Sequence, residues 1–115
     1  DLARHFERDH IDVPTLQAAS DEEVIALLTE IRGIGRWTAE MFLIFNLLRP
    51  DVLPLDDLGL LKAISLHYLD GEATERLLKR DGRVRVSQLA AAWAPWRSVA
   101  TWYLWRSLDP VPVEY

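Results

Sequence analysis

The 115-residue sequence contains no cysteine, and this absence removes several kinds of site at once. Disulfide bonds, thiolate zinc sites and cysteine-ligated iron–sulfur clusters cannot form in this chain. Three histidines are present, and His5 and His10 are five residues apart, a spacing that does not place them on one face of a helix. We therefore expect no metal centre built from side chains, no iron–sulfur cluster and no organic cofactor.

The sequence also lacks an excess of positive charge. Thirteen lysines and arginines stand against 18 aspartates and glutamates, which gives a net charge of −5 at pH 7. This is the wrong sign for a protein that holds DNA mainly through a basic surface. If nucleic acid is the partner, backbone amides, a few local cations or residues outside this chain must make the contacts.

Long apolar runs are missing as well. No segment approaches the roughly 20 apolar residues that cross a bilayer, and no charged-then-apolar leader precedes a cleavage site. We expect a soluble intracellular protein with no membrane partner. Half of the residues are hydrophobic, which is enough for one compact core, so we expect residues 1–115 to form a single unit.

The spacing of apolar residues predicts an all-α fold, a helical bundle of about five to seven helices joined by short connectors. The short apolar segment 52–55 has no partner strand and is expected to be extended, because its prolines bias the preceding residues away from the α region. Residues 11–14 are expected to be a connector. The expected helices are 1–8, a helix opened by residues 20–23 whose apolar face lies over 24–31, and then 37–48, 58–69, 74–79, 87–93 and 95–108.

Three local signals support these assignments. Ser20 and Glu23 form a capping-box pattern that predicts a helix start. Residues 37–48 are apolar on nearly every side, which predicts a central helix buried on most of its surface. Asp81 and Gly82 are expected to end the short helix before them, and Pro95 is expected to be the first residue of the last helix.

Two glycines one residue apart, Gly33 and Gly35, lie between two predicted helices in the segment 31–37. Glycine allows a positive φ and a tight turn because it has no Cβ. Backbone N–H groups at such a turn point outward and bind an anion such as a phosphate. The alternative is a plain helix–helix connection that needs glycine only for its geometry.

Asp56 and Asp57 directly precede the helix predicted to begin at residue 58. An aspartate at this position is ordinarily a cap that stabilises a helix by about 1 kcal/mol. With two carboxylates, one can cap while the other faces a cleft. A carboxylate beside an electron-deficient sugar stabilises developing positive charge, as in glycoside cleavage.

Three separated motifs resemble the helix–hairpin–helix (HhH-GPD) superfamily of base-excision DNA glycosylases, most closely its alkylbase or 3-methyladenine branch. The motifs occur in order over most of residues 29–105. They are Arg32–Ala39, Leu53–Asp57, and Trp93–Ser98 with Ala100 and Trp105. The resemblance implies that the hairpin amides bind a phosphate next to the lesion, a role that falls on Gly33, Gly35 and Thr38. It also implies a monovalent cation, Na⁺ or K⁺, held by the carbonyls of Thr29, Ile31 and Ile34.

The resemblance also selects the catalytic residue. In the family, the catalytic aspartate follows about 20 residues after the position that ends the hairpin, and the separation of Trp37 and Asp57 is 20 residues. Asp57 also precedes a Leu-Gly pair, as the family's aspartate commonly does, so Asp57 is the expected catalytic residue and Asp56 a cap or neighbour. Trp37 stands where bifunctional members carry a lysine nucleophile. The implied reaction is therefore monofunctional, with no strand cleavage.

By the same resemblance, Trp37 and Trp105 line the pocket for the damaged base, where aromatic rings bind a cationic purine by stacking. Trp105 has the alternative role of a core residue in the last helix. Met41 departs from the family pattern, since some relatives place an aromatic ring there. A thioether is more adaptable than a ring, so the preferred lesion is left open.

The sequence therefore predicts a monofunctional DNA glycosylase that flips alkylated purines such as 3-methyladenine out of double-stranded DNA and hydrolyses their N-glycosidic bond. Two alternatives are a non-catalytic helix–hairpin–helix DNA-binding module and a helical interaction domain. We also expect residues 1–115 to be the C-terminal portion of a longer enzyme, weak or inactive alone, with its missing N-terminal portion supplying the other wall of the cleft.

Overall fold

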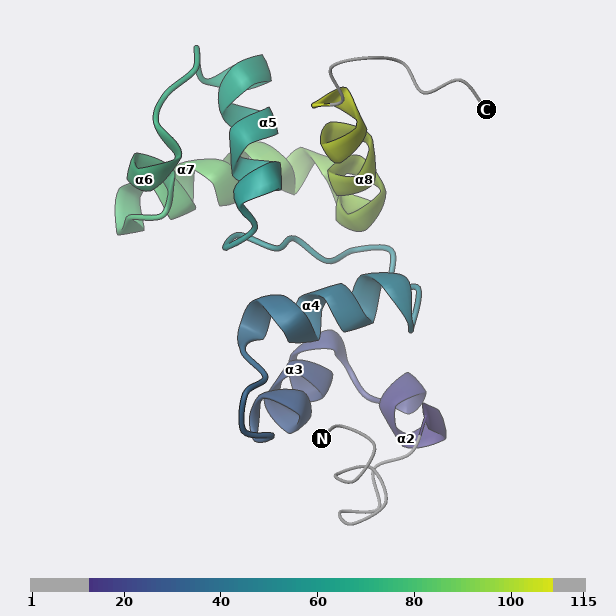
Figure 1. Ribbon diagram of the computed structural model, residues 1–115. Helices are drawn as coiled ribbons and strands as arrows, with labels where there is room; N and C mark the ends of the chain where they lie inside the picture. Colours follow the sequence, from purple (N-terminus) through teal and green to yellow (C-terminus); the bar gives the residue numbers. More distant parts are fainter. Residues whose placement is uncertain (1–12, 109–115) are drawn as a thin grey trace. The chain divides into compact units, whose positions relative to one another are not determined.

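The computed structural model describes residues 13–108, and within that range every regular element is a helix (Figure 1). The elements are α2 (Val13–Ala18), α3 (Asp21–Thr29), α4 (Arg36–Phe45), α5 (Leu58–Tyr68), α6 (Thr74–Leu77), α7 (Arg80–Ala90), the 3₁₀ turn η1 (Ala91–Trp93) and α8 (Arg97–Ser107). The predicted all-α class is confirmed. The helix expected at 1–8, together with His5 and His10, lies outside the described residues. None of the described helices has the length and apolar character that a bilayer crossing requires.

The chain forms two compact units that divide between Arg49 and Pro50. In the first unit α3 and α4 pack together. The capping box at the start of α3 is confirmed: Glu23 N donates to Ser20 Oγ over 3.2 Å, and Ser20 N donates to Glu23 Oε1 over 3.0 Å. The buried apolar residues of this unit are Leu16, Val24, Ile25, Leu28, Ile31, Ala39 and Leu43.

Helix α4 differs from the expectation of burial on most sides. Its buried residues are Ala39, Glu40 and Leu43, whereas Trp37 and Phe45 are 47% and 57% exposed. The prediction was wrong because α3 packs along α4 and covers one face, although the helix carries apolar residues around its circumference. The helix is also shorter than predicted and ends at Phe45.

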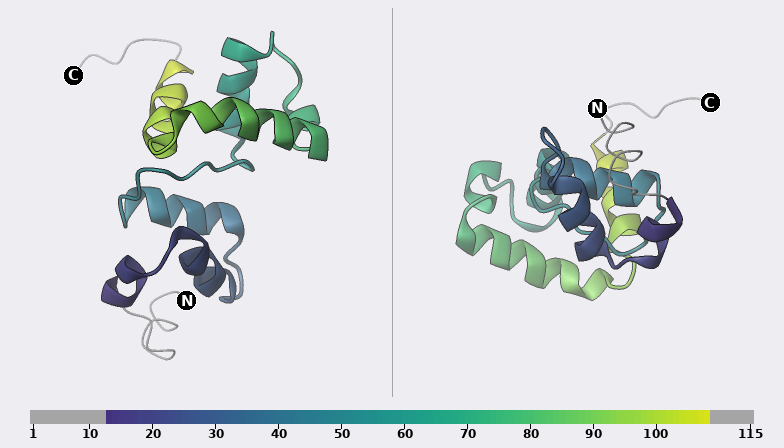
Figure 2. Two further views of the ribbon diagram at one scale, coloured as in Figure 1. Left: turned by 180° about the vertical axis from the view of Figure 1, so that it is seen from behind. Right: turned by 90° about the horizontal axis from the view of Figure 1, so that it is seen from below.

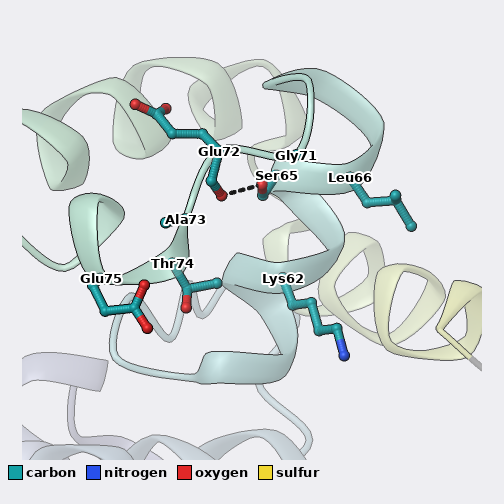
Figure 3. A pocket seen from close by; sticks show the side chains of 8 residues that line it. All are labelled: Lys62, Ser65, Leu66, Gly71, Glu72, Ala73, Thr74 and Glu75. Carbon is teal, nitrogen blue, oxygen red and sulfur yellow. Dashed lines mark hydrogen bonds between the residues drawn. The ribbon is translucent and has the colours of Figure 1, made fainter.

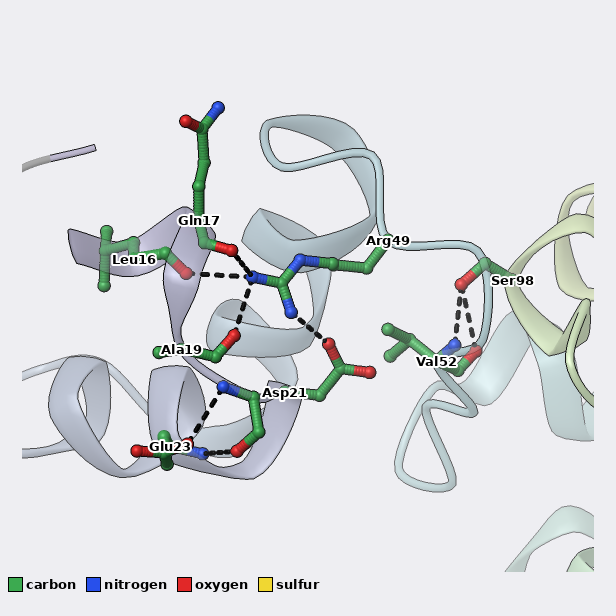
Figure 4. A network of polar contacts seen from close by, with 9 residues as sticks. Leu16, Gln17, Ala19, Asp21, Glu23, Arg49, Val52 and Ser98 are labelled. Carbon is green, nitrogen blue, oxygen red and sulfur yellow. Dashed lines mark hydrogen bonds and ion pairs between the residues drawn. The ribbon is translucent and has the colours of Figure 1, made fainter. Parts of the chain in front are cut away.

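The guanidinium group of Arg49, at the end of the first unit, bonds to residues between 16 and 21 (Figure 4). Its Nη2 donates to the carbonyls of Leu16, Gln17 and Ala19 over 2.8, 3.1 and 2.9 Å, and its Nη1 donates to Asp21 Oδ1 over 2.8 Å. Carbonyls at the end of a helix have no partner within the helix. Arg49 therefore completes the hydrogen bonding at the C-terminal end of the short helix α2.

In the second unit α5 packs against α8 and α6, and α6 packs against α7. Helix α7 runs across α5, and η1 connects it to α8 (Figures 1 and 2). The residues that pack into the core of this unit are Leu60, Leu61, Ile64, Leu77 and Val86, with Leu53, Leu55, Leu69, Trp93 and Leu104 partly buried against them. Residues 51–57, the extended segment, contain no helix or strand and form a stretched connection in Figure 1. Leu55, expected to be extended, lies instead in a turn at 55–56, where its N donates to Leu53 O over 3.0 Å.

Helix α7 begins seven residues before the helix expected at residue 87, because Gly82 does not end a helix but lies buried inside one. A Cβ at Gly82 would lie 2.3 Å from the carbonyl oxygen of Arg76 and 2.5 Å from the Cα of Leu77. The glycine therefore permits close packing of α7 on α6. A glycine needed for close approach and one that ends a helix have the same appearance in sequence.

Two prolines also lie differently from the prediction. Pro14, expected in a connector, lies in the first turn of α2, where proline is tolerated because the first N–H groups of a helix have no helical acceptor. Pro95, expected to begin the last helix, precedes it: Trp96 is the N-cap of α8 and Arg97 its first residue.

Candidate active site

The extended segment of the second unit leads directly into α5 through Asp57. Asp57 is the N-cap of this helix, and its Oδ2 accepts a hydrogen bond from Leu60 N over 2.8 Å. Its side chain is almost entirely buried. Of the two roles left open for Asp56, that of cap is wrong, because Asp57 is the residue immediately before the first helical turn and its oxygen reaches the third amide.

A second donor reaches the same oxygen of Asp57. Trp105 Nε1, on α8, donates to Asp57 Oδ2 over 2.7 Å. Hydrogen bonds to an ionised acceptor are shorter and stronger than those between neutral groups. Two residues that are 48 positions apart therefore meet at the predicted catalytic carboxylate. The sequence placed both in the site but gave no sign of a bond between them.

Gly59 lies beside this pair and leaves room for it. A Cβ at this position would lie 3.3 Å from Asp57 Oδ2 and 3.3 Å from Trp105 Cδ1. Both distances are shorter than ordinary van der Waals contact. The glycine of the Leu-Gly pair that follows Asp57 thus has a steric role, which the sequence alone did not indicate.

The start of the extended segment is also fixed to α8. Arg97 donates from its backbone N and its Nε to Asp51 Oδ1 over 3.1 and 2.8 Å, and from Nη2 to Asp51 Oδ2 over 2.9 Å. Val52 N donates to Ser98 Oγ over 2.7 Å (Figure 4). The side-chain hydrogen bonds from Arg97 hold the pKa of Asp51 below its ordinary value. Helix α8 therefore holds the segment at both ends.

The other aspartate of the pair has a different partner. Asp56 is exposed and forms an ion pair with Arg83 Nη1 on α7. Both side chains remain substantially exposed to solvent. The two adjacent carboxylates thus have different partners. Asp56 is a neighbour of the candidate site and bonds to Arg83, whereas Trp105 bonds to Asp57.

The hairpin lies in the first unit between α3 and α4. Gly33 has φ +93°, a value that favours glycine, whereas Gly35 has φ −92° and ψ 179°, which any residue adopts. Gly35 is the N-cap of α4 and supplies no side-chain cap to its first amides. Ile34 N donates to Ile31 O over 3.0 Å and closes the turn. Both glycines and Thr38 are exposed at the surface of this unit.

The remaining predicted residues are placed within their own units. Trp37 and Met41 are one turn apart on α4, the first half-exposed and the second partly buried, and Trp105 lies in the second unit. A pocket shared by these three residues stays a prediction. Thr29 is the last residue of α3. The cation expected at the carbonyls of Thr29, Ile31 and Ile34 also stays a prediction, and residues 13–108 hold no cluster of acidic or histidine side chains suited to a metal.

A pocket in the second unit lies apart from these residues (Figure 3). It is formed by α5, the segment that leads into α6 and the start of α6. Its lining consists of Lys62, Ser65, Leu66, Gly71, Glu72, Ala73, Thr74 and Glu75. Ser65 Oγ donates to the carbonyl of Glu72. The side chain of Glu72 is paired with Arg85 over 2.6 Å, and this contact lowers its pKa. Neither Asp57 nor Trp105 lines this pocket.

The known proteins that resemble this chain in sequence and in structure are of one kind. No family model matches the chain. DNA-3-methyladenine glycosylase 1 of Schizosaccharomyces pombe is 44% identical over 98 residues, which cover 83% of this chain and 40% of the relative. A DNA-3-methyladenine glycosidase from Bacillus halodurans has a similar structure, with a TM-score of 0.75 and 39% identity over 93% of this chain and 46% of that one. A Schizosaccharomyces pombe 3-methyladenine DNA glycosylase (Mag1) in complex with abasic DNA aligns with a TM-score of 0.65 and 38% identity over 87% of this chain and 46% of that one.

The hairpin, the capping aspartate and these similarities place the chain in the helix–hairpin–helix class of DNA glycosylases. Within that class, the chain belongs to the alkylbase, or 3-methyladenine, DNA glycosylase family. It spans less than half the length of the relatives it matches.

Proposed function

We propose that this chain carries the phosphate-binding hairpin and the catalytic aspartate of a monofunctional DNA glycosylase that removes alkylated purines from double-stranded DNA. The observation that carries the proposal is the fixed carboxylate of Asp57, held through one oxygen by Leu60 N and Trp105 Nε1. Its position at the end of the extended segment matches the motif shared with the family. The names of the relatives support 3-methyladenine as a substrate.

In the proposed reaction the damaged nucleotide is flipped out of the duplex. The bond between C1′ and the purine breaks, and the cationic base leaves with the bonding electron pair. Asp57 stabilises the positive charge that develops on the sugar. It also orients the water that adds to C1′ and accepts the proton that this water loses. The products are the free base and an abasic site, and no organic cofactor is required.

The hairpin supplies the anchor in this proposal. The amides at Gly33, Gly35 and Thr38 bind the phosphate beside the lesion, because the start of α4 presents N–H groups without a side-chain cap. A Na⁺ or K⁺ ion at the carbonyls of Thr29, Ile31 and Ile34 would stabilise the turn. Trp37 and Met41 contribute to the base pocket. Because the indole of Trp37 offers no amine, no Schiff base forms and the DNA strand is left intact.

The decisive experiment measures release of 3-methyladenine and 7-methylguanine from methylated DNA by the full-length protein. Asp57→Asn is the test variant, because asparagine can still cap α5. Asp56→Asn is its matched control. We expect a rate at least about 100-fold lower for Asp57→Asn, a typical effect of removing a charge-stabilising group. Release at the wild-type rate would refute the role of Asp57.

Two further measurements separate the alternatives. Strand nicking should be absent in the wild type; nicking coupled to base release would show that the monofunctional assignment is wrong. A full-length protein that binds DNA but releases no base would be the non-catalytic binding module. Because the relatives are more than twice as long as the stretch they share with this chain, residues 1–115 alone should show weak excision or none.

A further inference from the structure

The indole of Trp105 has a single hydrogen-bonding group, and that group is directed at Asp57. The indole Nε1–H is a donor only, so one acceptor accounts for its whole hydrogen-bonding capacity. At 2.7 Å from Asp57 Oδ2, the bond is at the short end of the range for N–H donors. The tryptophan is therefore engaged with the carboxylate before any base is bound.

The surroundings restrict both partners. On one side, Leu60 N holds the same oxygen over 2.8 Å. On another, the absent Cβ of Gly59 leaves just enough space for Oδ2 and the indole ring to meet. Two turns back along α8, Arg97 and Asp51 fix the helix to the start of the extended segment. Helix α8 is thus bonded to the extended segment at two points, Asp51 and Asp57.

We propose that Trp105 is a positioning residue for Asp57, with Gly59 providing the clearance that the bond requires. This inference rests on the proposed function, because positioning matters only if Asp57 reacts. Electrostatic stabilisation depends on groups that already have their final orientation when charge develops. Oδ2 serves as the fixed point of the carboxylate, and the bond from Trp105 prevents rotation of that carboxylate during the reaction.

This role differs from that of a stacking surface for the base, and phenylalanine separates the two. Trp105→Phe keeps an aromatic ring but removes the donor. In the full-length protein we expect its single-turnover excision rate to fall about 10-fold or more, the usual effect of losing a hydrogen bond to a charged group. Affinity for DNA that carries an abasic-site analogue should stay within about twofold.

Trp102→Phe is the matched control on the same helix. Trp102 is 43% exposed, contacts Tyr103 edge to face and lies under the guanidinium of Arg106. Its substitution should leave the excision rate unchanged. If Trp105→Phe also excises at the wild-type rate while Trp105→Leu does not, the ring acts by stacking and the positioning role is wrong.

A readout without catalysis tests the bond itself. In ¹⁵N-labelled full-length protein, the indole N–H signal that disappears in Trp105→Phe identifies Trp105. That signal should shift in Asp57→Asn and in Gly59→Ala and stay in place in Asp56→Asn. An unmoved signal in Asp57→Asn would overturn the proposal even if the protein is an active glycosylase. If the signal shifts as expected in Asp57→Asn and Gly59→Ala but the wild-type protein releases no base, the positioning contact holds and the proposed function is wrong.

Discussion

Asp56 and Asp57 are adjacent in the chain, yet their carboxylates bond to different helices. Asp57 accepts hydrogen bonds from α5 and from Trp105 on α8, whereas Asp56 is paired with Arg83 on α7. The first is almost entirely buried and the second exposed. A doubled aspartate thus provides one residue for the candidate site and one that connects the same turn to a third helix.

Removal of the Asp56–Arg83 pair should have small effects. Both side chains are more than a third exposed, and exposed ion pairs contribute about 0–1 kcal/mol to stability. For Asp56→Asn and Arg83→Gln we expect the free energy of unfolding to fall by less than about 1 kcal/mol and excision to stay within about threefold of wild type. Urea unfolding and single-turnover assays measure both. If Asp56→Asn lowers the excision rate as much as Asp57→Asn does, the two aspartates do not have separate roles.

The two hairpin glycines should respond differently to alanine. Gly33 has φ +93°, so Gly33→Ala should destabilise the protein by about 1–2 kcal/mol. Gly35 is an N-cap with extended backbone, and a Cβ at this position would have no atom of the described residues within 4 Å. Gly35→Ala should therefore cost only a few tenths of a kcal/mol. Thermal unfolding of both variants is the measurement, and equal losses would show that backbone strain at Gly33 is not the cause.

Gly82 should be the glycine least tolerant of substitution in the second unit. A Cβ there would overlap backbone atoms of Arg76 and Leu77, which cannot rotate away as a side chain would. We expect Gly82→Ala to lower the free energy of unfolding by about 3 kcal/mol or more, despite the higher helix propensity of alanine. Gln88→Ala, at an exposed position of the same helix, is the control and should be nearly neutral. A stabilised Gly82→Ala protein would mean that α6 and α7 do not pack this closely.

The Asp51–Arg97 pair should give stability a specific dependence on pH. Hydrogen bonds from Arg97 lower the pKa of Asp51 in the folded protein below its ordinary value of 3.8. The contribution of the ionised carboxylate is therefore complete above about pH 4 and is lost as the pH falls through the lower folded pKa. The stability difference between wild type and Asp51→Asn should be largest near pH 7 and shrink below pH 4. Urea unfolding at pH 7, 4 and 3 tests this, and a difference that does not change with pH would refute it.

Local signals in the sequence were reliable where a short-range rule governs the structure. The capping box at Ser20 and Glu23 depends on residues three apart, and it is present as predicted. The helix that begins at Leu58 follows a capping aspartate in the same way. The all-α class follows from periodicity, which needs no knowledge of how the helices pack.

The errors have a common physical origin in tertiary contacts. The sequence predicts a helix end at Gly82 because the close approach of this residue to α6 involves a neighbouring helix, and such a contact leaves no local signal in the sequence. The exposure of Trp37 depends on which helices cover α4, a property outside the segment itself. The bond from Trp105 to Asp57 joins residues 48 positions apart, so the sequence named both residues without revealing how they interact.

Catalytic groups commonly reduce the stability of a fold, since they are kept in place for function at the expense of better packing. Asp57 should be an exception to that trade-off. Its Oδ2 both caps α5 and receives the indole N–H of Trp105, so the group proposed to react also completes the hydrogen bonding of the helix that follows it. Asp57→Ala should therefore lose stability together with activity. Selection for a stable helix would by itself retain a capping side chain at this position, and only the reaction would require that this cap be a carboxylate, because asparagine also caps helices.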